Sequence, residues 1–176
     1  MKKFFTMMAL TGLLFTSISA CAQGGSDPSK RPSPPAKTTE TIASGATITI
    51  DYSAPSLKGR TIGKDVEPKK GEVWRAGAND ATVFEVSKDV TIEGKTLPAG
   101  KYAFFTLDNG NDYTLIFNKT SKQWGAYSYK QADDALRVNV KPGKSDTSVE
   151  KLNYSISKDG VVTLAWGTLV VAFKVK

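Results

Sequence analysis

Histidine is absent from this 176-residue chain, and cysteine occurs once, at Cys21. Without histidine the chain cannot build a Ser-His-Asp triad, a Cys-His pair, a histidine-ligated zinc site or a histidine pH switch. A single cysteine excludes an internal disulfide framework. Any catalysis would therefore depend on carboxylates, lysine or serine, and we expect no cofactor and no metal ion.

Acidic residues are fewer than basic ones, with 17 Asp and Glu against 24 Lys and Arg and a formal net charge of +7. The basic residues are spread along the chain and do not form the arginine-rich stripe that is typical of nucleic-acid binding. We therefore interpret the charge as a solvated surface and expect no nucleic-acid partner. Hydrophobic residues make up 40% of the chain, enough for a buried core, and the length favours one domain.

Long apolar runs are missing except near the N-terminus. Lys2 and Lys3 precede the apolar residues 4–18, which contain no charge. A run of about 15 residues suits the core of a secretory signal peptide and falls short of the roughly 18–20 that a membrane-spanning helix needs. We therefore interpret residues 1–20 as the signal peptide of an exported protein.

The cleavage site has two interpretations. Residues 18–21 read ISAC, which resembles a lipobox, the lipidation signal of bacterial proteins. Cleavage there would leave Cys21 first in the chain, carrying acyl chains that anchor the protein to a membrane on the periplasmic or outer surface. The alternative is an A-x-A site cut before Gln23, which would release a soluble periplasmic or secreted protein. Residues 21–35 are rich in Gly, Pro and Ser, and we interpret them as a tether.

From residue 36 onward, hydrophobic and polar residues alternate with a period of two, as in half-buried strands. Residues 101–107 are apolar on both faces, as expected for a central, covered strand. Turn residues separate the runs at spacings near 8–12 residues. About nine or ten short strands predict a single antiparallel β-sandwich over residues 36–176, with a closed β-barrel as the alternative. The best helix candidate, residues 130–135, has one or two turns at most.

The most unusual stretch is residues 74–80, which read WRAGAND. We expect a loop that displays Arg75, Asn79 and Asp80 to a polar ligand, because arginine offers a planar fork for carboxylate or phosphate. In the structural alternative, Gly77 supplies a special backbone angle, Asn79 or Asp80 closes a turn, and Arg75 pairs with a carboxylate.

A second candidate is residues 124–129, WGAYSY, which carry three aromatic rings in six positions. Exposed aromatic rings stack on sugars or form protein interfaces. We therefore include Trp124 and Tyr127 in the candidate ligand site. The alternative is a segment that plugs one end of the sandwich.

Two clusters of oxygen-bearing side chains are interpreted as structural. Residues 108–112, DNGND, could supply Ca²⁺ ligands, but they lack the rest of an EF-hand loop and suit an ordinary hairpin turn. Asp133 and Asp134 are adjacent carboxylates, but acid–base work on a glycoside needs a cleft and a set separation.

Several short motifs resemble those of an uncharacterised family. The resemblance rests, in chain order, on residues 59–60 (GR), 73–79 (VWRAGAN), 81–82 (AT), 97–102 (LPAGKY), Asn118 and 123–125 (QWG). These are similar to the motifs of domain of unknown function 2911, over about residues 34–176. The resemblance implies a one-domain exported bacterial protein, and it implies no established activity and no catalytic residues.

Together these observations predict a non-catalytic cell-envelope lipoprotein whose β-sandwich binds a polar small molecule, a glycan or a protein. Two alternatives stay open. Coplanar, exposed rings of Trp74, Trp124, Tyr127 and Tyr129 would favour a carbohydrate-binding module. A cleft with two carboxylates, or with one carboxylate beside Arg75, would favour a carboxylate-dependent enzyme.

Lipidation at Cys21 is directly testable. The intact mass of the native protein should match a chain that begins at Cys21 and carries acyl chains. Cys21→Ala should move the protein from the membrane fraction to the soluble fraction, because each buried CH2 of an acyl chain contributes about 0.8 kcal/mol to anchoring. A mature chain that begins at Gln23 and has no acyl mass would contradict this prediction.

Overall fold

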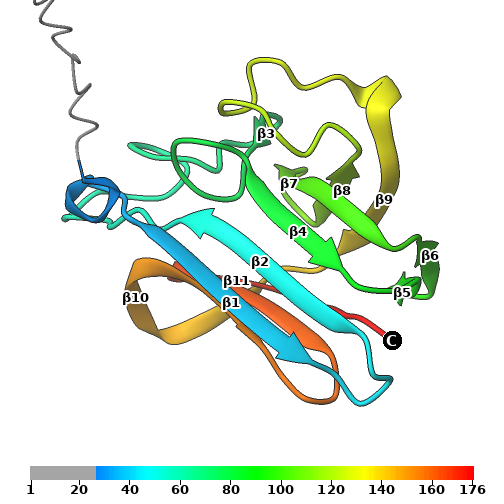
Figure 1. Cartoon of the computed structure of the whole chain (residues 1–176). Coiled ribbons are helices and arrows are strands. Elements are labelled where there is room, and N and C mark those ends of the chain that lie inside the picture. The colour runs from blue at the N-terminus through cyan, green and yellow to red at the C-terminus, as the bar shows by residue number, and fades with distance from the viewer. Residues whose placement is uncertain (1–26) are drawn as a thin grey trace, which may run out of the picture.

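The computed structural model describes residues 27–176, so the predicted signal peptide, Cys21 and the start of the tether lie outside the described residues. The described chain consists of strands, turns and two short 3-10 helices, η1 (Pro28–Lys30) and η2 (Gln131–Asp133) (Figure 1). The strands are β1 (Pro35–Thr41), β2 (Thr47–Ser53), β3 (Val73–Trp74), β4 (Thr82–Val86), β5 (Val90–Ile92), β6 (Lys95–Leu97), β7 (Gly100–Asp108), β8 (Tyr113–Asn118), β9 (Asp134–Val140), β10 (Gly143–Ile156) and β11 (Val161–Lys174).

Antiparallel pairing joins β1, β2, β4, β7, β8 and β9 in that order into one sheet, with the short β3 beside β7. Strands β10 and β11 form a long hairpin that supplies the second layer, seen in orange and red behind β1 and β2 in Figure 1. The Thr38 hydroxyl on β1 donates a hydrogen bond to the Tyr154 carbonyl on β10 at 3.0 Å, which links the two layers at one edge. A small hairpin of β5 and β6 extends one end of the sandwich.

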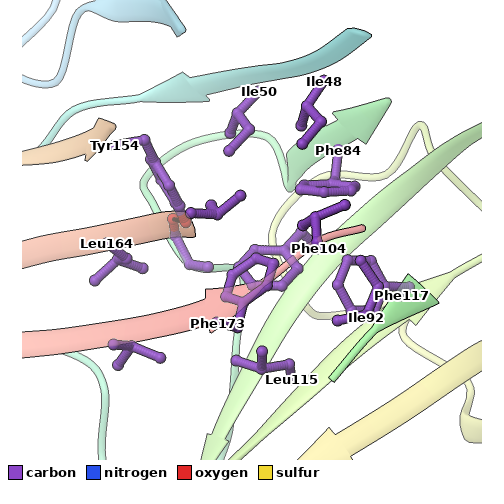
Figure 2. Packing of buried hydrophobic residues seen from close by; sticks show 14 of the residues in the cluster. Ile48, Ile50, Phe84, Ile92, Phe104, Leu115, Phe117, Tyr154, Leu164 and Phe173 are labelled. Carbon is purple, nitrogen blue, oxygen red and sulfur yellow. Dashed lines mark hydrogen bonds between the residues drawn. The ribbon is translucent and has the colours of Figure 1, made fainter. Parts of the chain in front are cut away.

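The main hydrophobic core lies between the sheet and the β10–β11 hairpin. Four buried phenylalanines meet there, Phe84, Phe104 and Phe117 from the sheet and Phe173 from β11 (Figure 2). Their ring centroids lie between 5.1 and 6.2 Å apart, within the range in which aromatic pairs attract. These rings therefore hold the two layers together at the centre of the molecule.

A smaller core lies on the opposite face of the sheet. Phe105 and Ile116 point away from the phenylalanine cluster and are fully buried. Residues 119–133, which connect β8 to β9, cover them, and the ring of Tyr129 packs edge-on against Phe105 with centroids 5.2 Å apart. Both faces of β7 are therefore covered, as the apolar sequence of residues 101–107 predicts.

The prediction of an all-β, antiparallel sandwich is confirmed, and the sheets do not close into a barrel. The described residues form eleven strands where about nine or ten are predicted. The helix candidate at residues 130–135 contains only the three-residue η2, because the alternating residues of β9 begin at Asp134. Within residues 27–176, no helix is long and apolar enough to span a membrane.

Several groups have shifted pKa values, and Asp159 and Tyr129 illustrate the expected effects on stability at acid and alkaline pH. The ammonium of Lys174, 2.7 Å from the carboxylate, lowers the pKa of Asp159 from 3.8 to about 2. Burial and the neighbouring Asp134 raise the pKa of Tyr129 from 10.0 to about 12. The Asp159 contribution is present above pH 3.8 and is lost as the pH falls toward 2. The Tyr129 contribution is present below pH 10.0 and is lost as the pH rises toward 12.

We therefore expect the melting temperature to be flat between roughly pH 6 and 8, because the chain has no histidine to titrate there. It should decline above pH 10.0 and below pH 3.8. Tyr129→Phe should make the alkaline decline shallower, because it removes one half-buried phenol whose pKa is raised. Thermal melts over this pH range check the prediction, and a transition near neutral pH would contradict it.

Candidate functional site

The loop of residues 74–80 is fixed by hydrogen bonds to its backbone. The hydroxyls of Thr82 and Tyr154 both donate to the buried carbonyl of Ala76, at 3.0 and 2.7 Å. Ala76 and Asn79 have positive φ angles of 51° and 59°, conformations that non-glycine residues seldom adopt. Gly77 leaves no room for a side chain, because a Cβ there would meet the Thr82 hydroxyl at 2.8 Å. The loop therefore has one tightly defined shape.

Trp74 anchors the start of this loop in the core. Its ring is buried and lies parallel to the ring of Trp166 on β11, with centroids 5.9 Å apart and an interplanar angle of 16°. Its indole N–H donates to the carbonyl of Gly77 at 3.1 Å. Arg75, the next residue, is half-buried, and among residues 27–176 no ion pair includes it. The structural alternative that pairs Arg75 with a carboxylate is therefore not realised.

The loop is joined to the aromatic segment around Trp124. Asp80 and Trp124 form an antiparallel bridge, and the Gly125 amide donates to the Asn79 carbonyl at 3.1 Å. Gly125 also lies close to Arg75, because a Cβ on Gly125 would come within 3.3 Å of the Arg75 Nη1. Four of the predicted ligand residues, Arg75, Asn79, Asp80 and Trp124, thus lie on two segments in direct contact.

The side chains of these residues differ in what they can offer a ligand. Asn79 donates its amide to the Ser33 carbonyl at 3.1 Å, so part of its hydrogen-bonding capacity is used within the chain. Asp80 is exposed. Trp124 and Tyr127 are 58% and 84% exposed, and they are the exposed large hydrophobic side chains of the described part of the chain.

Asp80 and Trp124 line a cavity of about 400 Å³, which we call the Trp124 cleft. Its other lining residues are Ala81, Val83, Ser121, Lys122 and Gln123. The Oε1 of Gln123 is buried and accepts no hydrogen bond, while its Nε2 donates to the Thr120 carbonyl. A smaller hollow of about 190 Å³ shares Asp80, Ala81 and Val83 and extends the cleft over β2.

Arg75 lines a different cavity of about 280 Å³, which we call the Arg75 cavity. Trp74, Gly77 and Trp166 contribute to it, together with charged residues of the loop between β2 and β3. The structure therefore separates Arg75 from Trp124, because the loop of residues 74–80 presents them to two cavities. Tyr127 lines neither of these cavities.

The remaining sequence candidates have structural roles. Trp74 is 3% exposed, and the Tyr129 hydroxyl donates to the carboxylate of Asp134 at 2.7 Å, so neither ring joins an exposed aromatic surface. Asp134 also pairs with Arg137 at 2.9 Å. In the turn of residues 108–112, the Asp108 carboxylate accepts the Gly110 amide, as in an ordinary hairpin. Residues 27–176 contain no group of side chains arranged to hold a metal ion.

Several lining residues of the Arg75 cavity were not singled out as site residues from the sequence, among them Arg60, Lys69 and Trp166. Trp166 belongs to the alternating pattern of β11, in which Val162 and Leu164 are also buried, so its sequence context indicates only a core residue. Arg60 lies in one of the motifs shared with the uncharacterised family, and this motif is the sequence feature that could have identified it as a site residue.

The fold and cavities define an all-β domain with open polar clefts at the loops that join its strands. The chain belongs to the family described as protein of unknown function (DUF2911), whose model matches residues 33–175. The matched region begins at Ser33, whose carbonyl accepts the Asn79 hydrogen bond. Comparison with curated proteins and with solved structures gives no match.

Alanine substitutions should separate packing from ligand contact in this loop. Trp74→Ala should lower the free energy of unfolding by about 3–5 kcal/mol, because it removes a buried ring. Arg75→Ala should lower it by about 1 kcal/mol or less, because no ion pair is broken. Urea denaturation measures both changes.

Arg137→Ala is the matched control for the loss of an arginine. It removes the positively charged partner of the Asp134 carboxylate, whose side chain is 6% exposed, and should lower the free energy of unfolding by about 3 kcal/mol. If Arg75→Ala destabilises the protein as much as Arg137→Ala does, Arg75 has a structural role and does not serve a ligand.

Proposed function

We propose that this chain is a lipid-anchored, exported protein of the bacterial cell envelope whose β-sandwich binds carbohydrate in the Trp124 cleft. Three sequence features support the location: the signal-peptide pattern of residues 1–20, the lipobox that ends at Cys21, and the Gly-, Pro- and Ser-rich residues 21–35. The family match supports a single domain after these segments, because it covers residues 33–175.

The exposure of Trp124 beside a cleft with both apolar and polar lining residues carries the binding proposal. A soluble domain normally buries its tryptophans, and 58% of Trp124 is open to solvent. Sugar rings have apolar faces that stack on aromatic rings and hydroxyl groups that exchange hydrogen bonds at their edges. The cleft offers both partners, because Trp124 supplies the ring and Ser121, Lys122 and Asp80 supply polar groups.

Gln123 adds a second reason for a hydroxyl-bearing ligand. Its Oε1 is buried without a hydrogen-bond donor among the described residues, and a buried acceptor without a donor is unfavourable. Gln123 lines the cleft, and a sugar hydroxyl is the kind of donor that this oxygen lacks. The cleft volume of about 400 Å³ lies within the roughly 300–1,000 Å³ range of ligand pockets and suits one or two sugar units.

The smaller hollow beside the cleft supplies two candidate residues for the alternative function, a carboxylate-dependent enzyme. It brings Asp51 and Asp80 into one lining, although Asp51 already pairs with Lys37 at 3.0 Å. Glycoside hydrolysis uses two carboxylates, one as acid and one as base or nucleophile. Carbohydrate binding does not require two free carboxylates, and for that reason we propose binding as the function.

Titration with soluble oligosaccharides and co-sedimentation with isolated cell-wall glycan test the proposal. Trp124→Ala should weaken binding about 10-fold or more, because a stacked ring contributes about 1 kcal/mol beyond its buried area. Tyr127→Ala is the matched control, since Tyr127 is more exposed and lies outside the cleft lining. Both variants should keep the wild-type melting temperature.

Two outcomes would overturn the proposal. Equal losses for Trp124→Ala and Tyr127→Ala would indicate non-specific adsorption through exposed rings. Release of shortened glycan by the wild-type protein, abolished in Asp80→Asn, would indicate hydrolysis in place of binding.

A further inference from the structure

Two residues that line the Arg75 cavity carry N–H donors that have no acceptor among the described residues. The indole N–H of Trp166 is buried and has no acceptor among the described residues. The Nε of Arg75 is also buried without an acceptor. Trp74, whose ring stacks on that of Trp166, shows the contrast, because its indole N–H donates to the Gly77 carbonyl at 3.1 Å. An indole and a guanidinium can only donate hydrogen bonds, so a ligand that binds them must supply acceptors.

The acidic side chains of this cavity accept hydrogen bonds from their own loop. The Asp65 carboxylate accepts the Thr61 amide at 2.9 Å, and the Glu67 carboxylate accepts the Lys69 amide at 3.0 Å. Both therefore help to shape the loop between β2 and β3. Among the described residues, neither carboxylate is in an ion pair.

Of the three basic side chains that line the cavity, one donates hydrogen bonds within the described chain and two do not. Arg60 donates through Nε and Nη2 to the carbonyls of Leu57 and Ser56, at 2.9 and 2.7 Å. In the described chain, Arg75 and Lys69 make no side-chain hydrogen bond or ion pair of this kind. Positive charge exceeds negative charge by one in the lining, and the two uncommitted basic side chains can only donate.

We infer that the Arg75 cavity is a binding site for a small organic oxyanion, with a carboxylate or phosphate group held by Arg75 and the indole N–H of Trp166. The guanidinium has the planar fork that matches such groups, and Lys69 adds a second positive charge. The volume of about 280 Å³ lies near the lower end of ligand pockets, which limits the ligand to a small molecule. This site is separate from the Trp124 cleft and does not depend on the proposed carbohydrate binding.

Titration of the whole purified protein with succinate, with inorganic phosphate and with neutral glucose tests the inference. Calorimetry and tryptophan fluorescence should both report saturable binding of at least one oxyanion, because Trp74 and Trp166 line the cavity. Succinate alone would identify a carboxylate as the bound group, and phosphate alone would identify a phosphoryl group. Failure of both oxyanions to saturate the protein would overturn the inference.

Arg75→Gln should weaken oxyanion binding about 10-fold or more, because it removes a charge-assisted hydrogen bond. Arg75→Lys should recover part of the affinity, since it restores the charge without the fork. Trp166→Phe should also weaken oxyanion binding, because it removes the indole N–H. If the Trp166→Phe variant does not fold, Arg75→Gln still tests the inference. Lys141→Gln is the matched control, because Lys141 is exposed and outside the cavity lining and the same charge is lost.

An equal loss in Lys141→Gln and Arg75→Gln would overturn the inference, because it would indicate general attraction of anions to a basic protein. Trp124→Ala separates the two proposals. It should leave the oxyanion affinity unchanged while it weakens carbohydrate binding, so that either proposal can fail while the other holds.

Discussion

The hydrogen bonds to the carbonyl of Ala76 hold together the parts of the molecule that form its surface cavities. Thr82 reaches this oxygen from the sheet and Tyr154 reaches it from the β10–β11 hairpin. Both hydroxyls are in the interior, where a hydrogen bond that is left unmade is unfavourable. The two layers of the sandwich therefore fix the same point of the loop of residues 74–80. Because that loop has a cavity on either side, its fixed shape determines both.

Burial on both faces of β7 places the aromatic segment beside this loop. The main core covers one face of β7, and residues 119–133 cover the other through Tyr129 and Phe105. Once this segment is packed on the sheet, Trp124 meets Asp80 as a bridge partner. The exposed ring is thus displayed by a supported piece of backbone, which reduces the conformational entropy that a ligand must restrict on binding.

The sequence predicts the parts of this fold that depend on local periodicity. Alternation identifies β2 and β4, where Ile48, Ile50 and Phe84 are buried. The two-sided apolar pattern of residues 101–107 identifies β7 as a covered strand.

What the sequence does not predict depends on contacts between distant segments. Residues 119–133 have no repeating pattern, so their position over the sheet follows only from the packed structure. Trp166 has the pattern of a core residue, and nothing local distinguishes its unpartnered N–H from the partnered N–H of Trp74. Arg75 and Trp124 are both identifiable as candidates, but their separation into two cavities depends on how the loop passes between them.

The hydrogen bond from the Asn79 side chain to the Ser33 carbonyl limits how far the folded domain could lie from a membrane anchor at Cys21. It fixes the start of the folded domain next to the loop that borders both cavities. If the proposed lipid anchor is at Cys21, the chain from Cys21 to Ser33 could span at most about 40 Å. Both cavities would then stay close to the membrane surface. Ligands held at that surface would be present at a high effective concentration relative to the domain.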